Sequence, residues 1–279
     1  YFDNTLGDGS NYLELNDNEI SVLKGLKALK DQGKIKKILI LMNFANQVEL
    51  DWIDSNEYGV DAALWAGTLG SVGTRAIAKI ISGEVNPSGG LVDTFWTRHH
   101  YNPVYANWTD SWFGYQYEEK PQDVTSPYSD DKVYNHTGSN VPTLPFVVYE
   151  EGIYNGYKYT ETRYEDVVMK TDKVGTFNYY DAVKYPFGYG LSYTTFKQEL
   201  VDVTFDNANK EYTVKVDVTN TGSVAGKSAC EVYAQKPYTQ YDKKYGVEKS
   251  AVDLVSYGKT KLLQPNEKET LFIKVKGEH

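Results

Sequence analysis

Residues 60–91 read VDAALWAGTLGSVGTRAIAKIISGEVNPSGGL and contain, in order, a strand, a glycine-rich loop, a helix and a turn. Residues 60–66 are apolar except for Asp61, a composition typical of a parallel strand that helices cover on both faces. Apolar side chains then recur at helical spacing over residues 76–81, and residues 86–89 (NPSG) form a turn by composition. This order of elements predicts one half of a doubly wound α/β domain.

The loop between that strand and helix is the first candidate site. Ligands of open α/β sheets bind at loops that follow the carboxyl ends of strands. Gly67 and Gly70 permit tight turns whose backbone N–H groups face a ligand, and Thr68 and Ser71 stand beside them. We therefore predict that Gly67, Thr68, Gly70 and Ser71 bind substrate. The alternative is that the glycines only let the helix pack closely on the strand.

The residues before this unit continue the same alternation of helix and strand. Asn16 followed by Glu19 is a capping-box pattern, which predicts the start of a long helix, and residues 38–42 are a buried strand by composition. Asn46 and Glu49 repeat the capping spacing and predict a second, short helix. We expect residues 38–42 to lie parallel to the strand described above, in a sheet that needs further strands at its front.

Composition and charge narrow the possible partners. The chain has 279 residues, 41% of them hydrophobic, and a net charge of −9 without any basic run. This balance fits a globular protein and disfavours nucleic acid and anionic membrane surfaces as partners. The longest apolar run, residues 38–42, is too short to span a bilayer, so we expect no membrane segment in this chain.

Metal-binding and redox signals are weak. The single cysteine, Cys230, has no partner for an internal disulfide, and the only close pair among the four histidines is His99-His100. Neighbouring residues of an extended chain point in opposite directions, so this pair does not form a metal site on its own. We expect no metal and no cofactor. The 25 tyrosines suit sugar stacking as well as strand packing.

The periodicity disappears after the α/β unit and returns near the end. Residues 96–148 are rich in asparagine, proline, aspartate and tyrosine, which we interpret as a segment that wraps around and completes the α/β domain. From residue 195 the pattern has period two, and Asn220-Thr221-Gly222 makes a turn. The expected division is therefore 1–95, 96–194 and 195–279.

The last part of the chain predicts an all-β sandwich. Five strand candidates are visible, namely residues 199–205, 212–218, 229–234, 254–263 and 270–275. An immunoglobulin-like sandwich has about seven strands. We therefore expect the chain to stop inside this domain.

Three segments resemble the family 3 glycoside hydrolases. They are residues 65–91, which open with WAG and close with NPSGGL, residues 151–159 (EGIYNGYKY) and residues 185–194 (YPFGYGLSYT). Residues 218–226 (VTNTGSVAG) look like the opening of the fibronectin type III-like domain of that family. The resemblance implies an α/β-sandwich domain with an open, mostly parallel sheet, followed by a fibronectin type III-like sandwich. It also implies a (β/α)₈ barrel that this chain lacks.

The resemblance further implies hydrolysis of a β-glucoside or β-xyloside by a retaining, exo-acting enzyme. Such enzymes place two carboxyl groups roughly 5 Å apart. In this family the nucleophilic aspartate lies on the barrel, while the acid/base glutamate commonly lies in a Glu-Gly context ahead of the first long helix. Here residues 7–9 read GDG, which makes Asp8 the candidate. A residue upstream of Tyr1 is an alternative, and so are Glu150 and Glu151, which also suit a hydrogen-bonding anchor.

The expected partners are thus a carbohydrate substrate and the barrel, and the chain alone is expected to be inactive. A non-catalytic carbohydrate-binding or structural module is the alternative. A nucleotide-binding domain is disfavoured, because the glycines at 67, 70 and 73 follow GxxGxxG spacing, their loop does not follow the first strand, and no lysine ends it.

Overall fold

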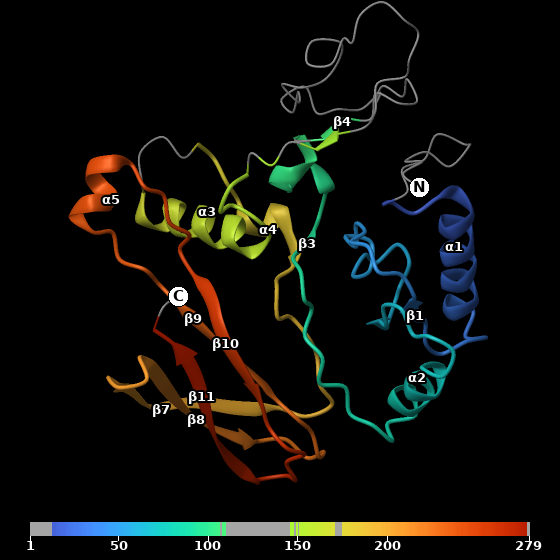
Figure 1. The fold of residues 1–279 in the computed structure, drawn as a ribbon. Helices are drawn as coiled ribbons and strands as arrows, with labels where there is room; N and C mark the ends of the chain where they lie inside the picture. Colours follow the sequence, from blue (N-terminus) through green and yellow to red (C-terminus); the bar gives the residue numbers. More distant parts are fainter. Residues whose placement is uncertain are drawn as a thin grey trace, which may run out of the picture.

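The computed structural model describes residues 13–106, 108–109, 146–147, 149, 151–170 and 175–277. Figure 1 shows three regions: helices α1 and α2 with strand β1 on one side, helices α3 and α4 beside β3, and the strands β7 to β11 below them. No helix among these residues is long and apolar enough to cross a bilayer. Asp8 and Glu150 lie outside the described residues.

Helix α1 (Asp17–Asp31) begins where the capping box predicts. The side chain of Asn16 accepts the backbone N–H of Glu19 at 3.0 Å, and the Glu19 carboxylate accepts the backbone N–H of Asn16 at 2.9 Å. These two bonds satisfy backbone donors that the first turn leaves without partners. Leu23 is the buried residue of the helix.

Strands β1 (Leu39–Met42) and β2 (Ala62–Trp65) pair in parallel, which confirms the predicted adjacency. Asp61 fixes the start of the pair, since its carboxylate accepts the backbone N–H of Ile38 at 2.8 Å and also binds Lys30 and Lys37. One expectation is wrong among the described residues. Leu39 and Leu41 are 41% and 44% exposed, so helices do not cover both faces of this sheet.

The short helix expected from Asn46 and Glu49 does not form. Residues 47–50 have no regular structure and residues 51–54 form turns. Glu49 is buried and its carboxylate accepts hydrogen bonds from residues after β3, so it does not cap a helix. Helix α2 (Thr74–Ile81) forms as predicted and buries Ile77.

A later segment of the chain, residues 183–189, pairs with residues 91–96 of the α/β region. Strand β3 (Phe95–Trp96) pairs antiparallel with β6 (Val183–Tyr185), and the backbones of Leu91 and residues 188–189 exchange two further hydrogen bonds. Phe95 packs in a core with Met42, Leu50 and Ile53. The remaining elements of this part are η1 (His99–Tyr101), η2 (Pro103–Ala106), the paired β4 (Trp108–Thr109) and β5 (Phe146–Val147), α3 (Tyr157–Met169) and α4 (Tyr179–Ala182).

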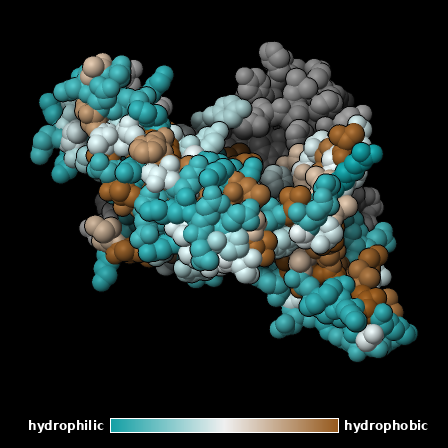
Figure 2. Space-filling view, turned by 90° about the horizontal axis from the view of Figure 1, so that it is seen from below, coloured by the Kyte–Doolittle hydropathy of each residue, from teal (hydrophilic) through white to brown (hydrophobic). Residues whose placement is uncertain are grey.

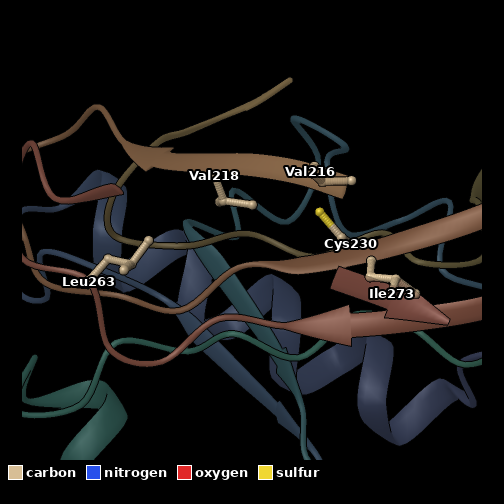
Figure 3. Packing of buried hydrophobic residues seen from close by; sticks show 5 residues of the cluster. All are labelled: Val216, Val218, Cys230, Leu263 and Ile273. Carbon is tan, nitrogen blue, oxygen red and sulfur yellow. The ribbon is translucent and has the colours of Figure 1, made fainter. Parts of the chain in front are cut away.

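All five predicted C-terminal strands are present, in two antiparallel sheets. The first sheet has the order β11-β8-β7 and the second pairs β10 with β9. Their bounds are β7 (Phe196–Asp206), β8 (Glu211–Asn220), β9 (Ala229–Ala234), β10 (Asp253–Lys259) and β11 (Lys268–Lys276), with α5 (Gln240–Tyr245) between β9 and β10. Figure 3 shows the core between the sheets, made by Val216, Val218, Cys230, Leu263 and Ile273.

Strand β7 carries apolar residues that this core does not cover. Its register places Leu200 beside Val216 and Val203 beside Val214, on the side of the sheet that carries the core. Leu200 is nevertheless 67% exposed and Val203 is 50% exposed. Seen from below, hydrophobic residues interrupt the hydrophilic surface in several small groups (Figure 2).

Candidate functional site

The glycine loop predicted from sequence follows the carboxyl end of β2. Gly67 has φ +58° and Gly70 has φ +61°, both in the left-handed region that glycine adopts without strain. A Cβ atom built on either residue would meet no atom within 4 Å. These two glycines are therefore needed for the backbone conformation, and they leave open space in front of the loop.

The four predicted binding residues lie together in this loop, with Thr68, Gly70 and Ser71 exposed and Gly67 half-buried. Gly73 is constrained differently, because a Cβ there would collide with the carbonyl oxygen of Leu69 in the same loop. The loop thus combines an accessible part with a part constrained by sterics.

A cavity of about 330 Å³, which the sequence did not reveal, lies in the same domain. Its walls come from Glu14 and Leu15, which precede α1, from Ile20 in the first turn of α1, and from residues between 49 and 58. Arg98, which follows β3, closes one side. We call this space the α1 cavity.

Glu49 contributes a buried carboxylate to the wall of the α1 cavity. It is 5% exposed, and its Oε2 accepts Nη1 of Arg98 at 3.0 Å while its Oε1 accepts the backbone N–H of His99 at 2.8 Å. Burial raises the pKa of Glu49, although the hydrogen bond from His99 acts in the opposite direction. Nη2 of Arg98 also lies 3.5 Å from Asp51. Glu49 therefore holds the arginine at the wall of the cavity.

Two aromatic rings supply an apolar wall. Trp52 and Tyr58 meet edge to face with ring centroids 6.4 Å apart, and Tyr58 is buried. The indole Nε1 of Trp52 donates to the backbone oxygen of Glu49 at 3.0 Å, which fixes the ring plane. At the rim, Glu57 pairs with Lys24 at 3.1 Å. The α1 cavity therefore offers carboxylate acceptors, guanidinium donors and an aromatic face.

The histidine pair does not build a metal site. No group of three or more His, Cys, Asp or Glu side chains converges in the part of the chain that the structure describes. Burial lowers the pKa of His99 to about 4, and its buried Nδ1 has no hydrogen-bond partner. Among the other carboxylate candidates, Glu151 is half-buried, and its backbone oxygen accepts the N–H of Tyr154 at 2.8 Å.

Comparison with known proteins gives one consistent result. Residues 5–193 match the sequence model of the glycosyl hydrolase family 3 C-terminal domain. The chain is 30% identical to a beta-glucosidase of Ruminococcus albus, over 98% of this chain and 22% of that protein. It is 29% identical to thermostable beta-glucosidase B of Acetivibrio thermocellus, over 84% of this chain and 23% of that protein. The chain thus spans about a quarter of the length of the curated relatives it matches.

Solved structures give the same result. A beta-glucosidase from Paenibacillus barengoltzii superposes with a TM-score of 0.68 at 29% identity, covering 98% of this chain and 23% of that one. Beta-glucosidase 3B from Thermotoga neapolitana, solved in complex with alpha-D-glucose, gives a TM-score of 0.65 at 28% identity and covers 94% of this chain and 28% of that one. The mixed α/β architecture described above is therefore that of these enzymes.

Proposed function

Because this chain belongs to glycosyl hydrolase family 3, we propose that it is part of an exo-acting β-glycosidase that hydrolyses β-glucosides or β-xylosides. The observation that carries this proposal is the similarity to a beta-glucosidase over 98% of the chain, together with the fold shared with the Paenibacillus enzyme. The glycine loop at the carboxyl end of β2 is in the place where α/β sheets bind ligands.

The reaction proposed is double displacement by two carboxyl groups. One attacks the anomeric carbon to form a glycosyl-enzyme intermediate, while the other protonates the leaving oxygen and then removes a proton from water. We assign the nucleophile to a (β/α)₈ barrel domain that acts together with this chain. Asp8 is the acid/base candidate, and Gly67, Thr68, Gly70 and Ser71 contact the substrate.

We divide the chain into an α/β domain (1–95), a segment that completes this domain (96–194) and a fibronectin type III-like sandwich (195–279). The pairing of β3 with β6 supports the first junction, because it brings residues 183–185 back onto residues 95–96. The two antiparallel sheets formed by β7 to β11 support the sandwich.

The test is an assay of the protein in which this chain accompanies a barrel. We expect release of nitrophenol from nitrophenyl β-glucoside or β-xyloside, and Asp8→Asn should slow hydrolysis of alkyl glucosides more than of nitrophenyl glucosides. A nitrophenolate leaves without protonation, so it depends least on the acid. An equal fold-reduction on both substrates in the Asp8→Asn variant, relative to the unmodified enzyme, would remove Asp8 from the acid/base role. Absence of glycosidase activity in the unmodified protein would overturn the proposed function.

A further inference from the structure

We propose that the α1 cavity binds one neutral pyranose ring. Binding of a sugar to this cavity can be measured without any hydrolysis. The binding proposal is therefore independent of the catalytic proposal.

The cavity lies at the carboxyl edge of β1. Helix α1 precedes β1 and is joined to it by the short connection of residues 32–38, so the first turn of the helix returns to the end of the sheet where β1 finishes. The backbone N–H of Glu49, seven residues after β1, donates to the oxygen of Leu13 at 2.8 Å. This edge is where open α/β sheets bind small molecules.

The volume and the aromatic wall suit a single sugar ring. Ligand pockets range from about 300 to 1,000 Å³, so a cavity of about 330 Å³ has room for one ring and not for an oligosaccharide. The Trp52 ring is half-buried and held by its bond to the Glu49 backbone, while Tyr58 braces it edge to face. The indole of Trp52 lines the cavity, and an aromatic ring is the side-chain group that stacks on the C–H face of a pyranose.

The polar wall matches the hydroxyl groups of a sugar. Asp51 is partly exposed and supplies carboxylate oxygens that accept hydrogen bonds from hydroxyl groups. Arg98 uses Nη1 on Glu49, and its side chain is half exposed, so further N–H groups can donate to sugar oxygens. The Ser55 hydroxyl, which accepts the N–H of Glu57 at 3.1 Å, has its own proton to donate.

The charge of the lining disfavours anionic ligands. Four carboxylates line the cavity (Glu14, Glu49, Asp51 and Glu57). Glu49 and Asp51 share the guanidinium of Arg98, and Glu57 pairs with Lys24, so four carboxylates face two cations and the formal charge is −2. Phosphate, sulfate and uronate ligands are therefore repelled. A neutral sugar uses the hydrogen-bonding groups without a change in charge.

Titration of the purified 279-residue chain with methyl β-glucoside, followed by NMR and calorimetry, tests the proposal. We expect saturable binding with a dissociation constant of about 1 mM, typical for a ligand of this size. The indole N–H signal that Trp52→Phe removes should shift on binding. Glucose 6-phosphate, added as an anionic probe, should bind more weakly, and glucosamine, added separately as a cationic probe, should bind no more tightly than methyl β-glucoside.

Two variants and one control locate the binding. Trp52→Ala should weaken binding at least about tenfold, and Asp51→Asn, which keeps the shape of the side chain, should weaken it about fivefold. Asp31→Asn is the matched control, because Asp31 also forms an ion pair, with Lys27 at 2.6 Å, but lies at the far end of α1. A melting temperature within a few degrees of that of the unmodified chain is required for each variant.

Three results would overturn the proposal. The first is absence of saturation up to about 100 mM methyl β-glucoside, a hundred times the expected dissociation constant. The second is an equal effect of Asp51→Asn and Asp31→Asn, and the third is tighter binding of glucosamine than of methyl β-glucoside, which would indicate a cation site. None of these depends on glycosidase activity, so the binding proposal and the catalytic proposal fail separately.

Discussion

The side-chain oxygen of Asn86 accepts the backbone N–H of Tyr193 at 2.8 Å, across 107 residues of sequence. The same oxygen accepts the Ser192 hydroxyl at 3.0 Å, and the side-chain nitrogen donates to the backbone oxygen of Ala225 at 3.1 Å. One amide therefore joins the turn after α2 to the residues before β7 and to the connection between β8 and β9.

Asn86→Ala should lower the free energy of unfolding by about 2–4 kcal/mol, because three hydrogen bonds, two of them partly buried, are lost at about 1 kcal/mol each. Urea unfolding measures this. Asn209→Ala is the control, since the Asn209 side chain donates to Asp206 in an exposed turn and its loss should cost less than about 1 kcal/mol. Equal losses in the two variants would show that the Asn86 bonds do not hold the two parts together.

Gly70→Val in the barrel-containing enzyme should reduce glycosidase activity at least about tenfold, while strain at positive φ costs about 1–2 kcal/mol of stability. The added side chain enters open space, so the expected damage is to the ligand side of the loop. Gly73→Ala should instead lower stability more than activity, because the added Cβ collides with Leu69. Parallel losses of activity and melting temperature in Gly70→Val would remove this loop from the binding site.

Acidification from pH 6.5 to 4 should destabilise the chain through His99. The folded protein holds this histidine neutral with a pKa of about 4, whereas the unfolded chain takes up a proton near pH 6.5. The stabilisation is thus present above pH 6.5 and is lost, at most about 1.4 kcal/mol per pH unit, as the pH falls toward 4. Nearby Glu49 acts in the opposite direction, because burial raises its pKa.

The comparison that isolates this effect is the unmodified chain against His99→Gln, by urea unfolding at several pH values. The difference in unfolding free energy between the two should shrink as the pH falls, since glutamine does not titrate. A constant difference between pH 7 and 4 would show that His99 has the same pKa in the folded and unfolded states.

The chain alone should hydrolyse nitrophenyl β-glucoside and β-xyloside no faster than buffer does. A retaining mechanism needs two carboxyl groups about 5 Å apart, and the nucleophile is assigned to the barrel. Nitrophenol release over hours at high protein concentration measures this. Turnover that disappears in Asp8→Asn or Glu49→Gln would place a complete active site within these residues.

Leu200→Ala and Val218→Ala should differ sharply, although both residues lie on the side of the β11-β8-β7 sheet that carries the core. Val218 is fully buried between the sheets, so its truncation should cost about 2 kcal/mol or more. Leu200 is exposed, and its truncation should change stability by less than about 0.5 kcal/mol. Thermal unfolding of both variants measures the difference, and similar losses would show that β7 is covered in solution.

Sequence alone determined the elements whose signals are local. The capping box at Asn16 and the alternation that makes β8 a strand with one buried face are confirmed, because each depends on spacing of a few residues. The parallel pairing of β1 with β2 is also confirmed, although it joins residues 23 positions apart, because both strands are recognisable as short apolar runs. The resemblance carried by short glycine and aromatic motifs is confirmed by the family match. Glycine permits the positive φ of Gly67 and Gly70 but does not determine it, since Gly73 in the same loop has φ −65°.

Tertiary structure decided what depends on partners far along the chain. The capping spacing at Asn46 and Glu49 predicted a helix, but Glu49 instead binds Arg98 and His99, which lie 49 and 50 residues later. The gain from satisfying a buried carboxylate exceeds the gain from one exposed helix cap. The α1 cavity and the bonds of Asn86 remained hidden for the same reason, because no local pattern records which distant backbone or guanidinium group will meet a side chain.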